Sequence, residues 1–307
     1  MTEFALALDI GGSHVTAAVV DLRERLLLER SLVRKGVEES APAHHLLDTW
    51  AVAAHQAHRL VGSPRLTHIG IAIPSPFDYQ GGFSLHEHKF RLLRGMNLTE
   101  GLRERWMSSA LAQVPVLYGN DADLFVLGEW WGGTARGAER VLGVTLGTGL
   151  GSGFLERGRV LTHDPRVPPD GELWNTPYRS TIAEDYASGR SIVLHHTRLT
   201  SRNWTVHEIS TAARDHDPHA QQVMQHFGEE LGQILTPWVS GFQPGLVVLG
   251  GNIARALDCF EAPLKARLQD VPIVTSTLFE QASLFGGAAL CQASEQYEQM
   301  DAPQLKL

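Results

Sequence analysis

The chain contains the same unit twice, a pair of apolar runs joined by a glycine-rich bend. The first unit runs from Phe4 to Val20 and has Gly11 and Gly12 at its bend. The second runs from Val141 to Phe154, with glycine at every second position from 147 to 153. Alternating apolar residues around such a bend predict a β-hairpin. A third short strand is expected after each hairpin, over 26–33 and 159–161. The repetition predicts two related units that face each other across a cleft.

Each bend is a candidate anion site. Glycine allows a tight turn and lets another group approach the backbone N–H groups closely, and adjacent N–H groups form a concave anion site. Asp9, at the edge of the first bend, is a candidate for holding a metal ion through water. An ordinary diglycine turn is the alternative interpretation of the first bend alone. The second copy favours phosphate binding, and two such bends fit a nucleoside triphosphate.

The second bend differs from a dinucleotide-binding loop. That loop requires Gly-x-Gly-x-x-Gly between a strand and a helix. Here the glycines alternate, and residues 154–158 continue as a strand and a turn. The chain also lacks the Gly-x-x-x-x-Gly-Lys-Ser/Thr pattern. The sequence therefore disfavours both common nucleotide-loop folds.

Composition narrows the classes of partner. With 307 residues, 43% hydrophobic and 20% charged, the chain is typical of a globular protein of two modest domains. A formal net charge of −8 argues against a nucleic-acid partner. Cys259 and Cys291 are too few for a disulfide framework or a thiolate zinc site. With no signal peptide and no apolar run long enough to span a bilayer, a cytoplasmic location is expected.

The pattern of elements restarts near residue 120. We therefore predict a smaller α/β domain over 1–119 and a larger one over 120–289, with a C-terminal helix at about 290–307 joining the first domain. Helices are also expected over 98–111 and 206–223, and the run from Ser283 to Leu290 is expected to begin a helix of small residues that packs closely. At this restart, a strand over 114–118 leads into Asn120 and Asp121 and then into a helical run. The pair is a candidate site at the end of a strand, and the alternative is that it only caps the helix.

Other polar residues follow predicted strands. His88 and Lys89 lie on the loop after a buried strand over 68–73, where ligand contacts are common. Gly250, Gly251 and Asn252 follow a strand over 246–249 and precede a helix, which lets a flat group lie against the backbone. His55 and His58, on a helix over 44–61, are read as part of a solvated face rather than as metal ligands.

Two carboxylates suit a polyol. Glu172 and Glu184 lie on neighbouring irregular segments, and carboxylate oxygens accept hydrogen bonds from hydroxyl groups. The alternative for Glu184 is that it opens the helix that follows.

In this order, the motifs resemble the sugar-kinase branch of the actin, hexokinase and Hsp70 superfamily, and more narrowly the ROK family of bacterial sugar kinases and repressors. The resemblance implies an α/β fold of two ribonuclease H-like domains that close over a sugar, with ATP and Mg²⁺ as cofactors. It matches the first phosphate motif to Asp9–Gly12 with Ser13 beside it, the second to Leu146–Gly151, and the adenosine motif to Leu249–Asn252. Within these motifs we expect nucleotide contacts from Gly11, Gly12, Gly147, Thr148, Gly149, Gly250, Gly251 and Asn252.

The resemblance also implies roles at the sugar. It makes Asp121 the catalytic base and matches Asn120, Asp121, Glu172 and Glu184 to sugar ligands. Asn175 stands where the family has a histidine that binds both sugar and zinc, and the cysteine cluster that follows is absent. We therefore predict no zinc and leave the sugar open. The family's repressors carry an N-terminal helix-turn-helix segment, and with only three residues before the first strand no DNA-binding role is expected. A homodimer, common in the family, is expected.

The hypothesis is an ATP-dependent, hexokinase-like phosphorylation of a glucose-like sugar at its primary hydroxyl. Asp121 would accept the hydroxyl proton, Mg²⁺ would lie near Asp9, and the amides of Gly11, Gly12, Gly147 and Gly149 would hold the phosphates. The alternatives are a sugar-binding regulatory protein without turnover, a kinase for an amino or N-acetyl sugar, and a kinase that uses polyphosphate.

Overall fold

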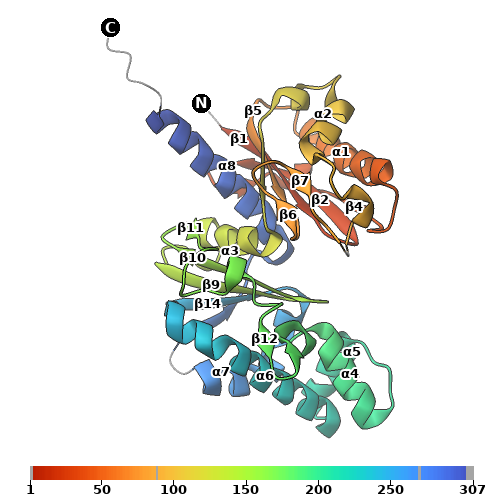
Figure 1. Ribbon diagram of the computed structural model, residues 1–307, viewed down its shortest axis with the longest axis vertical. Coiled ribbons are helices and arrows are strands. Elements are labelled where there is room, and N and C mark those ends of the chain that lie inside the picture. The colour runs from red at the N-terminus through yellow and green to blue at the C-terminus, as the bar shows by residue number, and fades with distance from the viewer. Residues whose placement is uncertain (1–2, 88, 269–270, 302–307) are drawn as a thin grey trace. The chain divides into compact units, whose positions relative to one another are not determined.

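The computed structural model describes residues 3–87, 89–268 and 271–301 (Figure 1). The chain divides into two compact units. Unit 1 comprises residues 1–132 and 281–307, and unit 2 comprises residues 133–280. A chain of this length is expected to form more than one hydrophobic core, and each unit has its own cluster of buried side chains.

Unit 1 is built on a six-stranded sheet in the order β3-β2-β1-β5-β8, with β4 also paired to β2. Its strands are β1 (Phe4–Ile10), β2 (His14–Asp21), β3 (Leu26–Leu27), β4 (Val33–Gly36), β5 (Leu66–Ala72) and β8 (Val116–Gly119). The β1–β2 pair is the predicted antiparallel hairpin, whereas β5 and β8 run parallel to β1. Because parallel strands end at the same edge, Asp9, Ala72 and Gly119 lie in one row at the carboxyl edge.

Alternation along β1 separates the two faces of this sheet. Leu6, Leu8 and Ile10 join the buried cluster that contains Trp50 of α1 (Ala43–Leu60). Ala7 lies on the opposite face, beside Gly287 of α8 (Ala282–Asp301). The remaining elements of unit 1 are α2 (Leu98–Trp106), α3 (Asp121–Trp131) and the two-stranded β6–β7 sheet (Phe77–Asp78 and Phe83–Ser84).

Small residues let α8 approach its neighbours closely. A Cβ at Gly70 of β5 would overlap the carbonyl of Gly287, and a Cβ at Gly286 would overlap the carbonyl of Leu124 in α3. Gly128 of α3 lies in the same way against the carbonyl of Ala282. The small-residue helix predicted from Ser283 to Leu290 is therefore confirmed. Its glycines serve close packing on both α3 and the sheet.

Unit 2 repeats this arrangement, with a five-stranded sheet in the order β11-β10-β9-β14-β15. Its strands are β9 (Arg140–Leu146), β10 (Leu150–Glu156), β11 (Arg159–Val160), β14 (Leu246–Gly250) and β15 (Ile273–Thr275). Again the first two strands form an antiparallel hairpin and β14 runs parallel to the first of them. In both units the hairpin strands are joined by three residues, 11–13 and 147–149.

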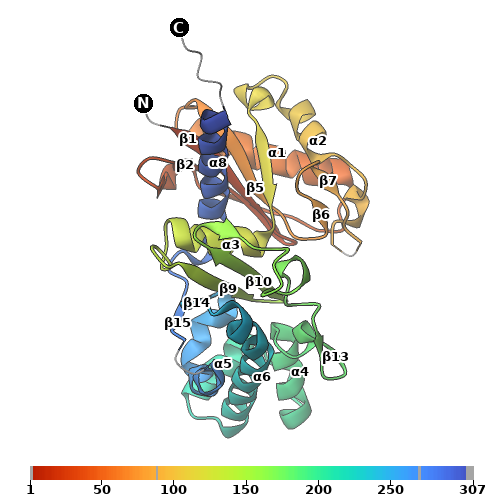
Figure 2. The same ribbon diagram turned by 60° about the vertical axis from the view of Figure 1, so that its left-hand side comes forward.

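Helices cover one side of the unit 2 sheet (Figures 1 and 2). They are α4 (Gly189–Thr200), α5 (Val206–Arg214), α6 (Pro218–Phe242) and α7 (Glu261–Leu268). A small hairpin, β12 (Pro177–Tyr178) and β13 (Thr181–Ile182), precedes α4. Asp217 caps α6 by accepting the Ala220 N–H at 2.9 Å, and Pro218 is its first residue. This start signal ends the continuous helix predicted over 206–223.

Two other element predictions are corrected. The strand predicted over 26–33 is split into β3 and β4, because the buried Ser31 hydroxyl accepts the Val19 N–H at 2.8 Å and replaces a ladder bond. The helix predicted over 98–111 ends at Trp106. A separate 3₁₀ turn begins at Ala110, where the Ser109 hydroxyl accepts the Leu111 N–H.

The division into units differs from the boundary expected at 119/120. Because α3 packs on α8, residues 120–132 group with unit 1, and α8 groups with them.

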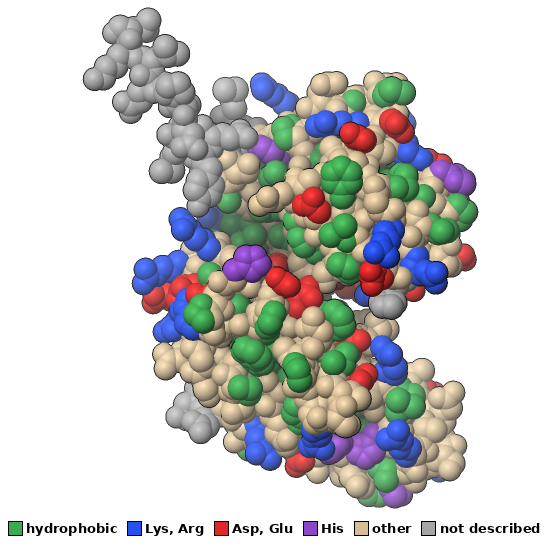
Figure 3. Space-filling view, in the orientation of Figure 1, with side chains coloured by type: hydrophobic (Ala, Val, Ile, Leu, Met, Phe, Trp, Pro, Cys, Tyr) green, Lys and Arg blue, Asp and Glu red, His purple; other side chains and the backbone are tan. Residues whose placement is uncertain are grey.

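On the face in Figure 3, Lys and Arg side chains are interspersed with Asp and Glu. Among the described residues, none of the helices combines the length and the apolar character needed to cross a bilayer.

Candidate active site

Asp121 is the first residue of α3, directly after the carboxyl edge of the unit 1 sheet. Asn120 is the N-cap, and its Oδ1 accepts the N–H groups of Ala122 at 2.9 Å and Asp123 at 3.3 Å. The Asp121 carboxylate also accepts the Ala122 N–H, at 2.9 Å. Capping is thus mainly the work of Asn120. The second carboxylate oxygen of Asp121 remains available for other chemistry at a helix N-terminus that favours negative charge.

Burial raises the pKa of Asp121, and this effect outweighs the opposing influence of Lys89, the Ala122 N–H and His86. Lys89, a predicted candidate, is exposed and close enough to Asp121 to act on it electrostatically. His88, the other candidate on this loop, lies outside the described residues. A carboxylate with a raised pKa is a stronger base than an ordinary aspartate, which suits proton abstraction.

His86 supports this loop and was not among the predicted site residues. Its ring is buried, with Nδ1 2.8 Å from the Ser84 hydroxyl and Nε2 2.8 Å from the Pro74 carbonyl. Because the carbonyl can only accept, Nε2 carries the proton and Nδ1 accepts from Ser84 in the neutral ring. Burial lowers the pKa of His86, which keeps it neutral. Exposure alternates from Phe83 to Glu87, but the buried positions are Ser84 and His86, whereas the apolar Phe83 and Leu85 are exposed. The hydrophobic pattern of the sequence therefore gave no signal for the burial of His86.

The first glycine turn lies at the same sheet edge as Asp121. Asp9 is two strands away from Gly119 in the row of paired residues, about 10 Å. The Gly11 N–H was expected to bind phosphate, but it donates to the His14 carbonyl at 2.9 Å and is therefore not available. Within the described residues, the N–H groups of Gly12 and Ser13 have no protein acceptor.

An unpredicted carboxylate accompanies this turn. The Oε2 atom of Glu39 lies 2.7 Å from the position that a Cβ on Gly12 would occupy. A phosphate bound at these amides would be repelled by Glu39 unless a cation lay between them. Together with Asp9, Glu39 supplies the hard oxygen ligands that Mg²⁺ prefers. The residues present therefore fit a magnesium–phosphate group.

The second glycine turn, in unit 2, is held by a bond within the turn and by a bond to α4. The Gly147 N–H donates to the Gly149 carbonyl at 3.0 Å, so this amide is also used inside its own turn, contrary to expectation. The Gly147 carbonyl accepts the N–H of Gly189, the first residue of α4, at 2.8 Å. In the described part of the chain, the N–H groups of Thr148 and Gly149 have no protein acceptor. They are the candidate phosphate donors of this unit.

The need for glycine at the end of β14 is clearest at Gly251, which directly follows the strand. It has φ of +78°, and a Cβ there would overlap the backbone of Leu146 at the end of β9. Gly251 therefore lets the chain pass directly over the carboxyl end of the neighbouring strand. Asn252 is exposed and begins a 3₁₀ segment, Asn252–Cys259, instead of the α-helix expected there. Gly250 is buried as the last residue of β14.

Three predicted sugar ligands, Glu172, Asn175 and Glu184, lie in one segment of unit 2. Glu172 is partly buried, and its Oε2 accepts the indole N–H of Trp174 at 2.7 Å. Asn175 is exposed. Glu184 lies on a 3₁₀ turn, Ala183–Asp185, and α4 begins five residues later at Gly189, so Glu184 does not open that helix. Its Oε2 instead accepts the Leu150 N–H at 3.0 Å, beside the second glycine turn.

The loop itself is anchored on β10. The Ser152 hydroxyl donates to the Gly171 carbonyl at 2.7 Å and accepts the Leu173 N–H at 2.9 Å. Thr176 then closes the next turn by donating to the Leu173 carbonyl at 2.7 Å. Across the described residues, no three His, Cys, Asp or Glu side chains are grouped to hold a metal ion. The absence of zinc stays a prediction.

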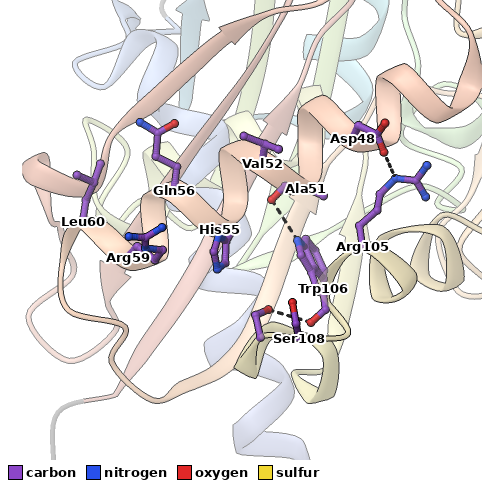
Figure 4. A pocket seen from close by; sticks show the side chains of 11 residues that line it. Asp48, Ala51, Val52, His55, Gln56, Arg59, Leu60, Arg105, Trp106 and Ser108 are labelled. Carbon is purple, nitrogen blue, oxygen red and sulfur yellow. Dashed lines mark hydrogen bonds and ion pairs between the residues drawn. The ribbon is translucent and has the colours of Figure 1, made fainter.

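A pocket of about 770 Å³ in unit 1 carries none of the predicted site residues (Figure 4). It lies between α1 and the end of α2, where Arg105 pairs with Asp48 at 2.6 Å and the Trp106 indole donates to the Ala51 carbonyl. His55 lines it, whereas His58 is buried and bonded to the Pro64 carbonyl. The two histidines therefore share no metal site.

Comparison with known proteins places this geometry in a family. The model of the ROK family matches residues 5–294. The glucokinase of Thermotoga maritima is 24% identical over 93% of this chain and 96% of its own. An N-acetylgalactosamine kinase of a Shewanella species is 28% identical over 92% and 94%.

A solved structure agrees with these relatives. The ROK hexokinase of Thermus thermophilus is 26% identical, covers 96% of this chain and 99% of its own, and superposes with a TM-score of 0.78. The predicted α/β fold of two ribonuclease H-like units is thereby confirmed. The chain belongs to the ROK family.

Proposed function

We propose that this chain is an ATP-dependent sugar kinase that phosphorylates the primary hydroxyl of a hexose. One observation carries the proposal: a partly buried carboxylate with a raised pKa, Asp121, stands at the sheet edge that also carries the first glycine turn. Kinases named for glucose and for N-acetylgalactosamine among the relatives support the reaction class.

Asp121 acts as the general base. Its free carboxylate oxygen accepts the proton of the sugar hydroxyl as that oxygen forms a bond to the γ-phosphorus of ATP, and the bond to the ADP oxygen breaks. Such a base contributes on the order of 10²–10⁴-fold. Asn120 and the Ala122 N–H hold Asp121 in place, so the carboxylate does not have to be ordered during the reaction.

The glycine turns bind the phosphates. The donors are the N–H groups of Gly12 and Ser13 in unit 1 and of Thr148 and Gly149 in unit 2. Mg²⁺ would be held by Asp9 through water, with Glu39 beside it, and would supply charge neutralisation on the transferred group. Gly251 and the exposed Asn252, directly after β14, contact the adenosine.

The sugar is held by groups that accept and donate hydrogen bonds. Glu172 and Glu184 accept from hydroxyls, and Asn175 and Asn120 offer amides that do both. The exposed indole of Trp174, which holds Glu172, also offers an apolar surface beside these ligands. This surface favours an N-acetyl hexose as the second candidate substrate, in line with the 28% identical relative.

The test is ADP release with ATP and each of glucose, mannose, fructose, allose and the N-acetylated hexoses, repeated with polyphosphate in place of ATP. Sugar binding is measured in parallel by calorimetry. Turnover with one sugar class supports the proposal and names the substrate. Sugar binding without ADP or phosphate transfer would replace the kinase with a regulatory sugar-binding protein. Light scattering then tests the expected homodimer.

A further inference from the structure

A buried carboxylate on α6 holds the tip of the β12–β13 hairpin. The side chain of Glu230 is about 2% exposed. Its Oε2 lies 2.7 Å from the Tyr178 hydroxyl, and its Oε1 lies 2.6 Å from the Arg179 guanidinium. Gln233 is three residues further along α6, and its Oε1 lies 2.9 Å from the same hydroxyl. Two adjacent hairpin residues are thus bound to one point on the helix.

The chemistry of this contact is strong enough to position a loop. A buried carboxylate needs compensating partners, because its desolvation otherwise makes the charged form unfavourable. Arg179 supplies the charge, and Tyr178 donates a hydrogen bond. His226, also on α6, lies 3.4 Å from Oε1. Hydrogen bonds to an ionised group are about twice as strong as neutral ones.

Aromatic contacts fix the hairpin on its other side. The Tyr178 and Tyr186 rings meet edge to face at 5.1 Å, and the Arg179 guanidinium lies over both, 5.4 and 5.6 Å from their centres. The Tyr186 hydroxyl is 3.0 Å from Ser180. Arg179 itself has φ of +50°, a left-handed conformation that a non-glycine residue keeps only when its surroundings hold it.

The fixed tip is continuous with the candidate sugar ligands. Beyond the paired residues of β12 and β13, the Ala183 N–H donates to the Thr176 carbonyl at 3.0 Å and the Glu184 N–H donates to the Trp174 carbonyl at 3.1 Å. These bonds set Glu184 opposite the Glu172–Trp174 end of the loop. Residues 171–188 contain no cysteine or histidine.

We propose that Glu230 is a positioning residue for sugar binding. By holding Tyr178 and Arg179 on α6, it fixes the segment 172–186 and with it Glu172, Asn175 and Glu184. The proposal rests on the proposed function for its effect on sugar affinity, whereas the ordering of the segment is independent of any activity.

The experiment compares Glu230→Gln with Glu229→Gln, a matched change of charge at the exposed neighbouring position on the same helix. Hydrogen exchange reports the Ala183 and Glu184 amides, and limited trypsin digestion reports cleavage after Arg179. In Glu230→Gln we expect both to become roughly tenfold faster, since one charge-assisted contact is lost. In Glu229→Gln both stay within twofold of the wild type.

Kinetics give the second readout. The KM for the sugar should rise roughly tenfold in Glu230→Gln. The Kd for ADP without sugar should rise less than this, because Gly189 still holds the second glycine turn and only the contact of Glu184 with Leu150 is loosened. Tyr178→Phe removes only the hydroxyl, and it should shift both readouts in the same direction by about threefold. If Glu230→Gln does not fold, Tyr178→Phe tests the positioning role in its place.

The failures of the two proposals are distinguishable. A wild type inactive on every sugar overturns the proposed kinase, but exchange and trypsin digestion still test the role of Glu230. An active wild type whose Glu230→Gln and Tyr178→Phe variants match it in exchange, digestion and sugar KM overturns the positioning role.

Discussion

Glu184 accepts the backbone N–H of Leu150, with 3.0 Å between its Oε2 and the nitrogen. This bond joins the loop of candidate sugar ligands to the turn of candidate phosphate donors within unit 2. The same carboxylate lies against Gly149, where any Cβ would overlap it. One side chain is thus placed to affect binding of both substrates.

Glu184→Ala should therefore weaken both sugar and nucleotide binding. The Leu150 N–H loses its acceptor, and we expect the Kd for ADP to rise about three- to tenfold. Glu172→Ala removes a carboxylate that, among the described residues, is bonded only to Trp174, and it should change sugar affinity alone. Calorimetry with ADP and with the sugar checks both variants. An unchanged ADP Kd in Glu184→Ala would contradict the coupling.

Asp121→Asn should abolish turnover without loss of fold. We expect kcat to fall by about 10²–10⁴-fold while the sugar Kd stays within a few-fold, because the amide keeps the size and hydrogen-bonding shape of the side chain. Asp123→Asn, on the same turn of α3, is the control and should keep most of its activity. A coupled assay of ADP release measures the effect. Wild-type turnover in Asp121→Asn would refute the assignment of the base.

The pH dependence follows from the raised pKa of Asp121. The base works only when ionised, so kcat/KM should fall as the pH falls through this pKa, which lies above the ordinary value of 3.8. Burial lowers the pKa of His86, so its ring stays neutral to a lower pH than that of an ordinary histidine. Initial rates from pH 4 to 8, with folding monitored by circular dichroism, define the acidic limb. A kcat/KM that stays constant down to pH 4 would disagree with the burial of Asp121.

The raised pKa of Asp121 also predicts how this residue affects the stability of the fold. Because the folded pKa exceeds the unfolded one, ionised Asp121 destabilises the fold. This cost is absent below the ordinary pKa and complete above the raised one. At pH 7 we expect the Tm of Asp121→Asn to equal or exceed that of the wild type. Differential scanning fluorimetry at pH 7 tests this, and a clearly lower Tm would contradict it.

Alanine substitutions at two glycines distinguish the cost of a positive φ from the cost of a steric clash of the added Cβ. Gly137 and Gly251 have φ of +81° and +78°, but a Cβ at Gly137 meets nothing within 4 Å, whereas one at Gly251 overlaps Leu146. Gly137→Ala should cost about 1 kcal/mol of unfolding free energy. Gly251→Ala should cost roughly 2 kcal/mol or more. Urea unfolding measures both, and equal losses would show that the contact with Leu146 is unimportant.

The local patterns predicted most of the fold. Alternating apolar residues around glycine identified both hairpins, and the polar pair Asn120 and Asp121 marked a strand end followed by a helix. These features are set by neighbouring residues in the chain. The split at Ser31 was not predictable, because it depends on a side-chain bond to Val19, twelve residues away.

The candidate site was harder to predict in its details. Glu39 approaches Gly12 only because the chain returns after β4, and no spacing in the sequence signals that contact. The use of the Gly11 N–H inside its own turn depends on the turn geometry, which residue types alone do not fix. In the sequence, His86 is the first of four consecutive polar residues and does not differ from its neighbours. Only the structure shows that its ring is buried between Phe77 and Phe90.

The placement of α8 affects the order in which the chain can fold during synthesis. Residues 133–280 form a continuous unit that is complete when they leave the ribosome. The first 132 residues must wait, because the Gly70 and Gly128 surfaces are covered only by a helix translated after them. The N-terminal part of this protein is therefore made first and finished last, and until then it presents a bare sheet face that chaperones would be expected to shield.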